Sequence, residues 1–219
     1  MTTMSGALRL LFSSAFVIAA ALGFATVDLF ASNDEPAAEW VSSVQPFYTS
    51  QDLTTDVALV GDWHYGQEVT LTFTPTNKGS YKLVLRDMSH DKPDTYTFDA
   101  HLFRLGVDSF LDLYPTSVPK SAELYALFSV PCHVVAKVSF PDDRLQLIFL
   151  NAAWFADQSK SGNITISHIQ TDGLILLTAT TEEMQELLYL NAASEEAFNE
   201  HIEFGRPDDS VQDPQEEAQ

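Results

Sequence analysis

The side chains best suited to metal binding or nucleophilic chemistry are six histidines and a single cysteine. No two histidines have the spacing of a metal-binding motif such as HExxH or HxH. His90 lies beside Asp87 and Asp91 in a predicted turn, where contact with water is enough to explain it. The sequence therefore predicts neither a metal site nor a cofactor.

The remaining candidates for catalysis are also explained by structure. His101 occupies a polar position beside Asp99 on a predicted strand, so we expect it to point to water. Cys132 and His133 are adjacent, and neighbouring strand residues face opposite sides of a sheet, so they cannot pair directly. GxSxG motifs and phosphate-binding glycine loops do not occur in the sequence. We expect a non-enzymatic protein, and an enzyme whose residues converge from distant strands remains the alternative.

Aromatic side chains at alternate strand positions form the strongest candidate site. We assign ligand binding to five of them, at inward positions of the predicted strands: Trp63, Phe73, Tyr81, Tyr96 and Phe98. Phe110 is expected to face the same way. Two interpretations stay open, because these rings either line a pocket for a small apolar ligand or fill a small barrel, which side chains can do at about eight strands.

The elements that position these rings are mostly short strands. Residues 68–74, EVTLTFT, alternate apolar and polar side chains, which is the period of a strand with one wet face. An Asn/Gly loop at 75–79 joins this run to a second alternating run, which predicts a hairpin. Further strands are expected at 57–63, 95–104, 110–114, 133–140, 144–150, 164–168 and 173–179. This order predicts an antiparallel sheet without parallel βαβ units.

Two short helices complete the predicted domain. The first covers residues 151–157. The second begins at Thr180 or Thr181 and continues to about Leu190, with acidic residues in its first turn that favour the helix dipole. From Pro207 onward the chain has too little apolar surface to fold.

The tripeptide Gly61-Asp62-Trp63 stands near the start of the meander. It resembles the Gly-x-Trp signature of lipocalin-like (calycin-type) barrels, whose tryptophan packs across the barrel floor. The resemblance covers residues 57–114 and implies a mainly β fold and a ligand-binding role. The expected fold is an antiparallel meander that closes into a lipocalin-like barrel of about eight or nine strands, with two short helices and an N-terminal apolar helix. The helix at 151–157 and the lack of a cysteine pair depart from that family.

The N-terminal segment points to a membrane. Residues 10–27 are an almost unbroken apolar run, preceded by Arg9, which is typical of a signal peptide or a single anchor. We therefore expect a signal or anchor at 1–31, a linker at 32–56, a β-barrel-like domain at 57–204 and a disordered acidic tail at 205–219. The domain is expected on the extracytoplasmic side, tethered through residues 10–27 or secreted.

The charge of the chain excludes some partners. The net charge is −20, and a large part of the excess lies after Glu182, where Arg206 is the single basic residue. This balance argues against nucleic acids and anionic lipid surfaces as partners. It leaves open an envelope interaction or assembly protein that uses the second helix and the acidic tail. The single cysteine excludes an intrachain disulfide.

Overall fold

The computed structural model of the chain describes residues 40–89, 93–117, 130–171, 174–199 and 201–207. The apolar helix predicted near the N-terminus and most of the acidic tail lie outside these residues. Among the described helices, none combines the length and the apolar character that a membrane crossing requires.

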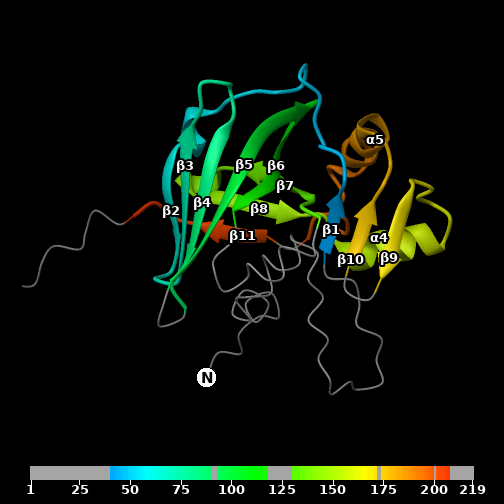
Figure 1. Cartoon of the computed structure of the whole chain (residues 1–219). Coiled ribbons are helices and arrows are strands. Elements are labelled where there is room, and N and C mark those ends of the chain that lie inside the picture. Colours follow the sequence, from blue (N-terminus) through cyan, green and yellow to red (C-terminus); the bar gives the residue numbers. More distant parts are fainter. Residues whose placement is uncertain (1–39, 90–92, 118–129, 172–173, 200, 208–219) are drawn as a thin grey trace, which may run out of the picture.

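The described residues form a mainly β fold with two α-helices, as predicted (Figure 1). The eleven strands found there are β1 (Trp40–Ser43), β2 (Gly61–Tyr65), β3 (Val69–Pro75), β4 (Tyr81–Asp87), β5 (Asp94–Leu105), β6 (Asp108–Ser117), β7 (His133–Ser139), β8 (Leu145–Phe149), β9 (His168–Thr171), β10 (Leu174–Leu177) and β11 (His201–Phe204).

Strands β2 to β7 form the predicted antiparallel meander, in which each strand pairs with the next. The alternation of side chains works as expected, because Phe73 and Leu83 are buried opposite each other while Thr74 and Lys82, also paired, are exposed. The strand predicted at 57–63 begins later than expected. Its first residues form the short 3-10 helix η1 (Val57–Leu59), which Asp56 caps by accepting a hydrogen bond from the Ala58 amide.

The sheet divides at β7. One edge of this strand pairs with β6, while the other edge is shared between β1, which pairs with His133 and Val134, and β8, which pairs with residues 136–139. Strand β1 also pairs with β10 in parallel. The sheet is therefore mixed, and the prediction of a purely antiparallel sheet is wrong. The parallel pair joins strands that are distant in sequence, so no βαβ pattern announces it.

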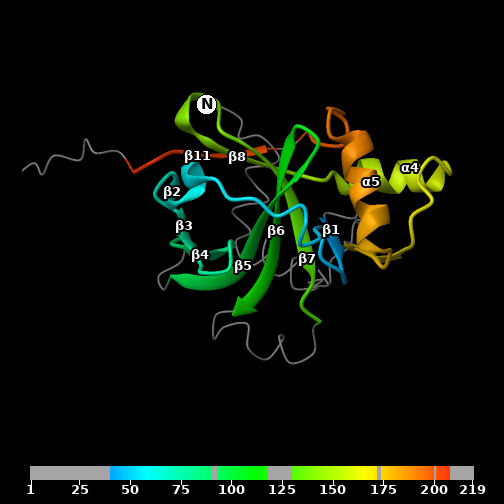
Figure 2. The ribbon, with the colours of Figure 1, turned by 90° about the horizontal axis from the view of Figure 1, so that it is seen from above.

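The sheet does not close into a barrel, which corrects the prediction. Its strongly curved course is visible from above (Figure 2). Strand β11 pairs with β8 along its whole length, but it reaches β2 only through one isolated bridge, where His64 and Gly205 exchange backbone hydrogen bonds of 2.8 and 2.9 Å. A continuous closing ladder is prevented because β11 has only four residues and β7 gives part of its free edge to β1.

The two helices lie beside β1, β9 and β10, at the end of the sheet away from β2 to β4 (Figure 1). Asn151 is the N-cap of helix α4 (Ala152–Lys160), and its side chain accepts a hydrogen bond from the Trp154 amide. Thr180 is the N-cap of helix α5 (Thr181–Asn191) and forms a capping box with Glu183.

Apolar side chains gather in two cores. The first lies on the inner face of the meander and contains the predicted aromatic set. The second lies between the opposite face of β5 to β7 and the two helices, and includes Phe103, Phe110, Phe155 and Leu188. Residues 40–56, expected to be part of a linker, contribute to this second core through Val41 and Phe47, which are both buried.

Candidate functional site

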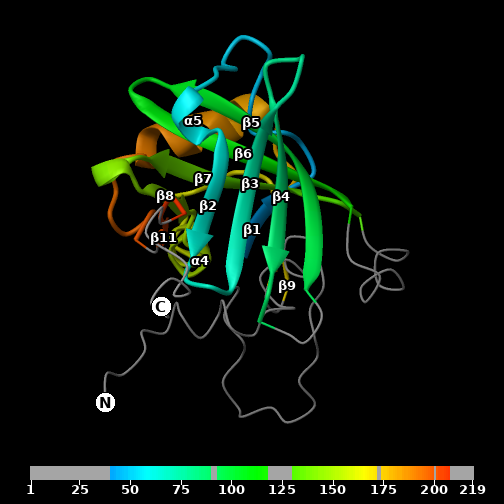
Figure 3. The ribbon, with the colours of Figure 1, turned by 90° about the vertical axis from the view of Figure 1, so that its left-hand side faces the viewer.

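The structure brings all five predicted ligand-binding residues into the first core. Trp63 comes from β2, Phe73 from β3, Tyr81 from β4, and Tyr96 and Phe98 from β5, strands that lie next to one another in Figure 3. None of the five is more than 5% exposed. Phe73 and Tyr81 make an edge-to-face contact with ring centroids 6.3 Å apart. The rings thus pack against one another on the inner face.

Two of these residues use their polar atoms within the domain. The indole N–H of Trp63 donates to the carbonyl of Leu59 at 2.9 Å. The hydroxyl of Tyr81 donates to the carbonyl of Asp56 at 2.9 Å and accepts from the Asp56 amide at 2.7 Å. Burial, together with the nearby carboxylates of Asp94 and Asp87, raises the pKa of Tyr96 to about 12, so its phenol stays neutral at physiological pH.

Phe110 does not join this set, which corrects the sequence-based expectation. Its neighbours Leu111 and Leu113 face the first core, so the alternation of β6 places Phe110 on the opposite face. There it stacks on Phe103 with a centroid distance of 5.6 Å. The prediction failed because Phe103 and Phe110 stand on either side of the β5–β6 turn. The local pattern does not specify which face of the sheet each ring occupies.

Arg206 closes one end of the first core and is a residue that the sequence analysis missed. Its guanidinium carbon lies 3.7 Å from the centroid of the Trp63 ring. The same group donates hydrogen bonds to the carbonyls of Ala58, Val60 and Asp62 at 2.6, 2.9 and 3.3 Å. One exposed side chain thereby ties the end of β11 to η1 and β2.

Helix α5 separates its residues sharply into two faces. Met184, Leu187 and Leu188 are buried in the second core at the positions expected for an amphipathic helix. The cap is strong, because the Thr180 hydroxyl accepts from the Glu183 amide and the Glu183 carboxylate accepts from the Thr180 amide. The hydrogen bonds that the Thr180 amide and hydroxyl donate to the Glu183 carboxylate lower the pKa of Glu183.

The outer face of α5 ends in an apolar patch. Tyr189 and Leu190 are 62% and 70% exposed, although they directly follow the buried Leu187 and Leu188. The Tyr189 ring lies over Gly106 of the β5–β6 turn, so close that a Cβ atom at Gly106 would meet it at 2.9 Å. The next residue of that turn, Val107, is 94% exposed. We call Val107, Tyr189 and Leu190 the apolar patch.

The helix that carries Tyr189 and Leu190 is acidic on its exposed side. Glu182, Glu183 and Glu186 are exposed on α5, and Glu186 stands three and four residues before Tyr189 and Leu190, which places it beside them on the helix surface. Residues 181–199 contain no lysine or arginine. Lys137 of β7 donates to the carbonyl of Ala192 at 2.6 Å just after the helix, but it is already paired with Asp108 at 2.8 Å.

Cys132, His101 and His133 belong to neither of these two sites. Cys132 is buried, and burial raises the pKa of its thiol. His101 is half-buried against Tyr48 rather than facing water, which corrects the expectation. His133 pairs with the fully buried Asp112, a contact that sequence analysis missed. The only feature of the sequence that could have indicated this contact is Asp112 itself, a charged residue between the apolar Leu111 and Leu113.

The described residues include no group of three or more His, Cys, Asp or Glu side chains placed to hold a metal ion. Searches against protein-family models, curated proteins and solved structures returned no match.

Proposed function

We propose that this chain is a non-enzymatic interaction domain of the cell envelope, which binds a basic segment of a protein partner through the outer face of α5. The observation that carries the proposal is the apolar patch, whose Tyr189 and Leu190 lie on the same helix as Glu182 and Glu186, which form no ion pair within the described part of the chain. An exposed apolar patch bordered by polar residues is typical of a protein-binding surface.

The charge pattern of α5 supports a basic partner. Glu182 and Glu186 stand four residues apart, and like charges at that spacing destabilise a helix by a few tenths of a kcal/mol. A lysine- or arginine-containing segment would relieve this repulsion, while an apolar residue of the same segment would cover Leu190. Burial of Leu190 by the partner contributes about 1–2 kcal/mol to the free energy of binding, scaled from the value for full burial of a leucine side chain.

Two other occupants fit less well. A second copy of this chain brings its own net charge of −20 to the same surface. An anionic lipid surface is repelled by the acids of α5 for the same reason. Self-association through a second copy remains as a measurable outcome of the test below.

The test uses a defined probe, a synthetic amphipathic peptide of lysine and leucine, titrated into the purified protein while the amide resonances are followed by NMR. We expect shifts at Val107, Tyr189 and Leu190. Leu190→Ser should weaken binding by about tenfold or more. Val57→Ser, which alters a side chain that is 85% exposed outside α5, is the matched apolar control and should leave binding unchanged.

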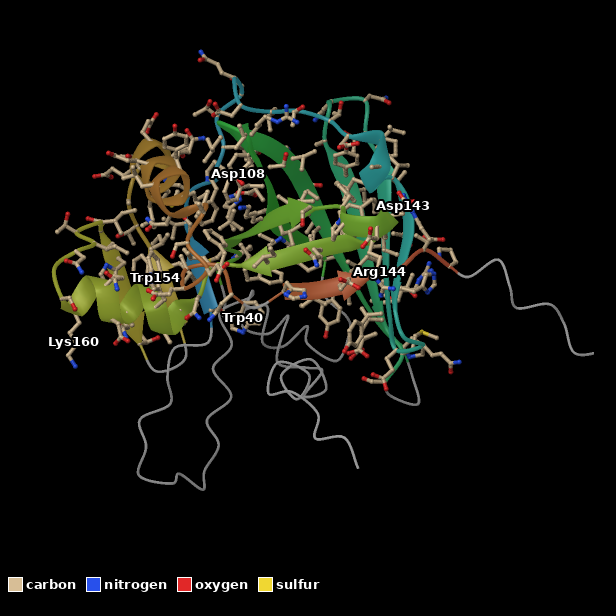
Figure 4. All side chains as sticks on the ribbon, turned by 180° about the vertical axis from the view of Figure 1, so that it is seen from behind. Trp40, Asp108, Asp143, Arg144, Trp154 and Lys160 are labelled. Carbon is tan, nitrogen blue, oxygen red and sulfur yellow. The ribbon has the colours of Figure 1, made fainter. Side chains whose placement is uncertain are left out.

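Charge is controlled in the same way. Glu182→Gln with Glu186→Gln removes two acids from α5, whereas Asp142→Asn with Asp143→Asn removes two exposed acids from the β7–β8 turn, away from α5 (Figure 4). The first pair should weaken binding more than the second. Equal losses would mean non-specific attraction, and a dimer that Leu190→Ser dissociates would mean self-association. Either result overturns the proposal.

We also propose, as a second function, that the inner face of the sheet binds a small apolar molecule in the lipocalin-like manner. The supporting observation is the seam between β2 and β11 beside the aromatic core, where a single backbone bridge and the side chain of Arg206 take the place of a continuous ladder. Native mass spectrometry of gently purified protein tests this function. Bound mass that disappears in a Phe98→Ala variant supports it, and protein that always arrives empty overturns it.

The location of the domain is part of the proposal. The apolar run at 10–27 supports export or tethering, which places α5 and its partner on the extracytoplasmic side of the membrane. Sequencing of the mature N-terminus separates the two cases. A start after residue 25 or 31 indicates cleavage, and an intact N-terminus indicates an anchor.

A further inference from the structure

A buried carboxylate lies at the junction of three elements on the outer face of the meander. Asp112 of β6 is 0% exposed. Its Oδ1 lies 2.8 Å from Nδ1 of His133 on β7, and its Oδ2 accepts a hydrogen bond of 2.9 Å from the amide of Phe47. Asp112 therefore attaches the segment that follows β1 to the sheet. We call residues 44–48 the junction segment.

The junction segment also contacts α5. The hydroxyl of Thr181 donates to the carbonyl of Pro46 at 2.8 Å, and the side-chain amide of Gln185 donates to the carbonyl of Phe47 at 3.1 Å. Phe47 itself is fully buried in the second core. The segment is thus held between the sheet on one side and the helix on the other.

The histidine opposite Asp112 completes the cluster. His101 of β5 is the cross-strand partner of Asp112, and its ring stacks on Tyr48 with centroids 4.5 Å apart and planes 22° from parallel. The Nδ1 atom of His101 is buried and has no hydrogen-bond partner among the described residues. A proton placed there would bury an N–H without an acceptor, which costs about 1–3 kcal/mol if the ring does not move.

We infer that protonation of His101 releases the junction segment from the sheet. When His101 is neutral, its ring supports Tyr48 and the segment stays docked. When His101 is protonated, its ring must leave the stack to expose Nδ1 to water, and Tyr48 loses its support. The inference goes beyond the proposed function, because it concerns how the junction segment docks on the sheet and not what α5 binds.

The charges around His101 set the direction of the effect. Burial lowers the pKa of His101 below its ordinary 6.5. The carboxylates of Asp112 on β6 and Asp99 on β5 act in the opposite direction and raise the pKa, whereas His133 on β7 lowers it further. Tyr48, on the junction segment, stays neutral because burial and the same two carboxylates raise its pKa.

A histidine whose pKa is lowered in the docked state favours release when it binds a proton. Docking is therefore complete above the ordinary value of 6.5 and is lost as the pH falls toward and through the lowered pKa.

Hydrogen exchange of the Phe47 amide tests the inference, because this N–H donates directly to Asp112. Protection factors are measured in the intact protein at about pH 7.5 and about pH 5.5, after correction for intrinsic exchange rates. We expect Phe47 to lose protection at the lower pH by about threefold or more, while the amide of Leu111 within β6 keeps its protection. Equal protection of Phe47 at both pH values would overturn the inference.

His101→Phe keeps an aromatic ring against Tyr48 but removes the titration, so protection of Phe47 should become independent of pH. His201→Phe, at an exposed histidine of β11, is the matched control and should behave like the wild type. If the His101→Phe protein does not fold, the pH titration of the His101 ring resonances in the wild type tests the inference instead. Their midpoint must lie below 6.5 and coincide with the loss of Phe47 protection. A response that persists in His101→Phe, or a midpoint that does not coincide, refutes the release by His101.

Discussion

Replacement of Arg206 tests the account of how the end of the sheet is held. Arg206→Ala removes the cation that lies 3.7 Å from the centroid of Trp63 and the donors to three backbone carbonyls. Arg206→Lys keeps the charge but loses the planar group that stacks on the ring and bonds to several acceptors at once. The two variants therefore separate the charge from the geometry.

The expected loss follows from the contacts. A cation over a tryptophan ring contributes about 1 kcal/mol when the cation is partly exposed. The two shorter hydrogen bonds, to Ala58 and Val60, add about 0.5–1 kcal/mol each, because water can reach the carbonyls once the arginine is gone. Arg206→Ala should therefore lower the free energy of unfolding by about 2–3 kcal/mol, which corresponds to about 4–12 °C in Tm. Arg206→Lys should cost about half as much.

Urea unfolding followed by tryptophan fluorescence measures this loss, with the m-value as a check that the unfolded state is unchanged. The control is Arg144→Ala, which removes an exposed arginine paired with Glu203 and should cost less than about 1 kcal/mol. If Arg206→Ala costs no more than Arg144→Ala, the stacked guanidinium does not hold the end of the sheet and the reasoning is refuted.

Three further predictions concern the helix cap, the core and alkaline pH. Thr180→Ala should destabilise the protein by about 1 kcal/mol through loss of the α5 cap, while Thr165→Ala, at an exposed position, should stay within about 0.5 kcal/mol in the same urea assay. Phe73→Ala should cost about 3–5 kcal/mol, whereas Leu190→Ser should cost about 0.5 kcal/mol or less; a large loss for Leu190→Ser would show that the apolar patch is part of a core. Because the pKa of Tyr96 is raised to about 12, the folded state holds this proton more tightly than the unfolded state, so the contribution of Tyr96 to stability is present below about pH 10 and is lost as the pH rises through about 12. A Tyr96→Phe variant should lose less stability over that range, and an unchanged alkaline unfolding profile would contradict the assignment.

Local patterns predicted the meander and the second helix well. The alternation around Phe73 and Leu83 correctly identified the buried face of β3 and β4, because each strand has one face in the core and one in water. The acids after Thr180 correctly marked the start of α5. The five aromatic residues assigned to ligand binding do lie together, although whether they bind a ligand stays a prediction.

The features that sequence analysis missed depend on contacts between distant parts of the chain. The stack of Arg206 on Trp63 joins the end of β11 to β2, and its hydrogen bond to Ala58 spans 148 residues. The pair of Asp112 and His133 spans 21 residues and joins two strands whose register a single sequence does not reveal. Strand β1 was overlooked because four residues carry too little alternation to stand out. Closure of the sheet was predicted from the succession of short strands and from the Gly-x-Trp resemblance, neither of which says how β7 shares its edge.

The division of β7 also determines how the domain responds to mechanical force. Strand β1 lies between β7 and β10, parallel to β10 and antiparallel to β7. A pull on the chain at Trp40, directed along β1, loads the hydrogen bonds on both sides of the strand in shear, so that several must break together rather than one after another. A pull at right angles would open the same bonds in sequence. The domain should therefore resist traction through its N-terminal side most strongly along the direction of β1.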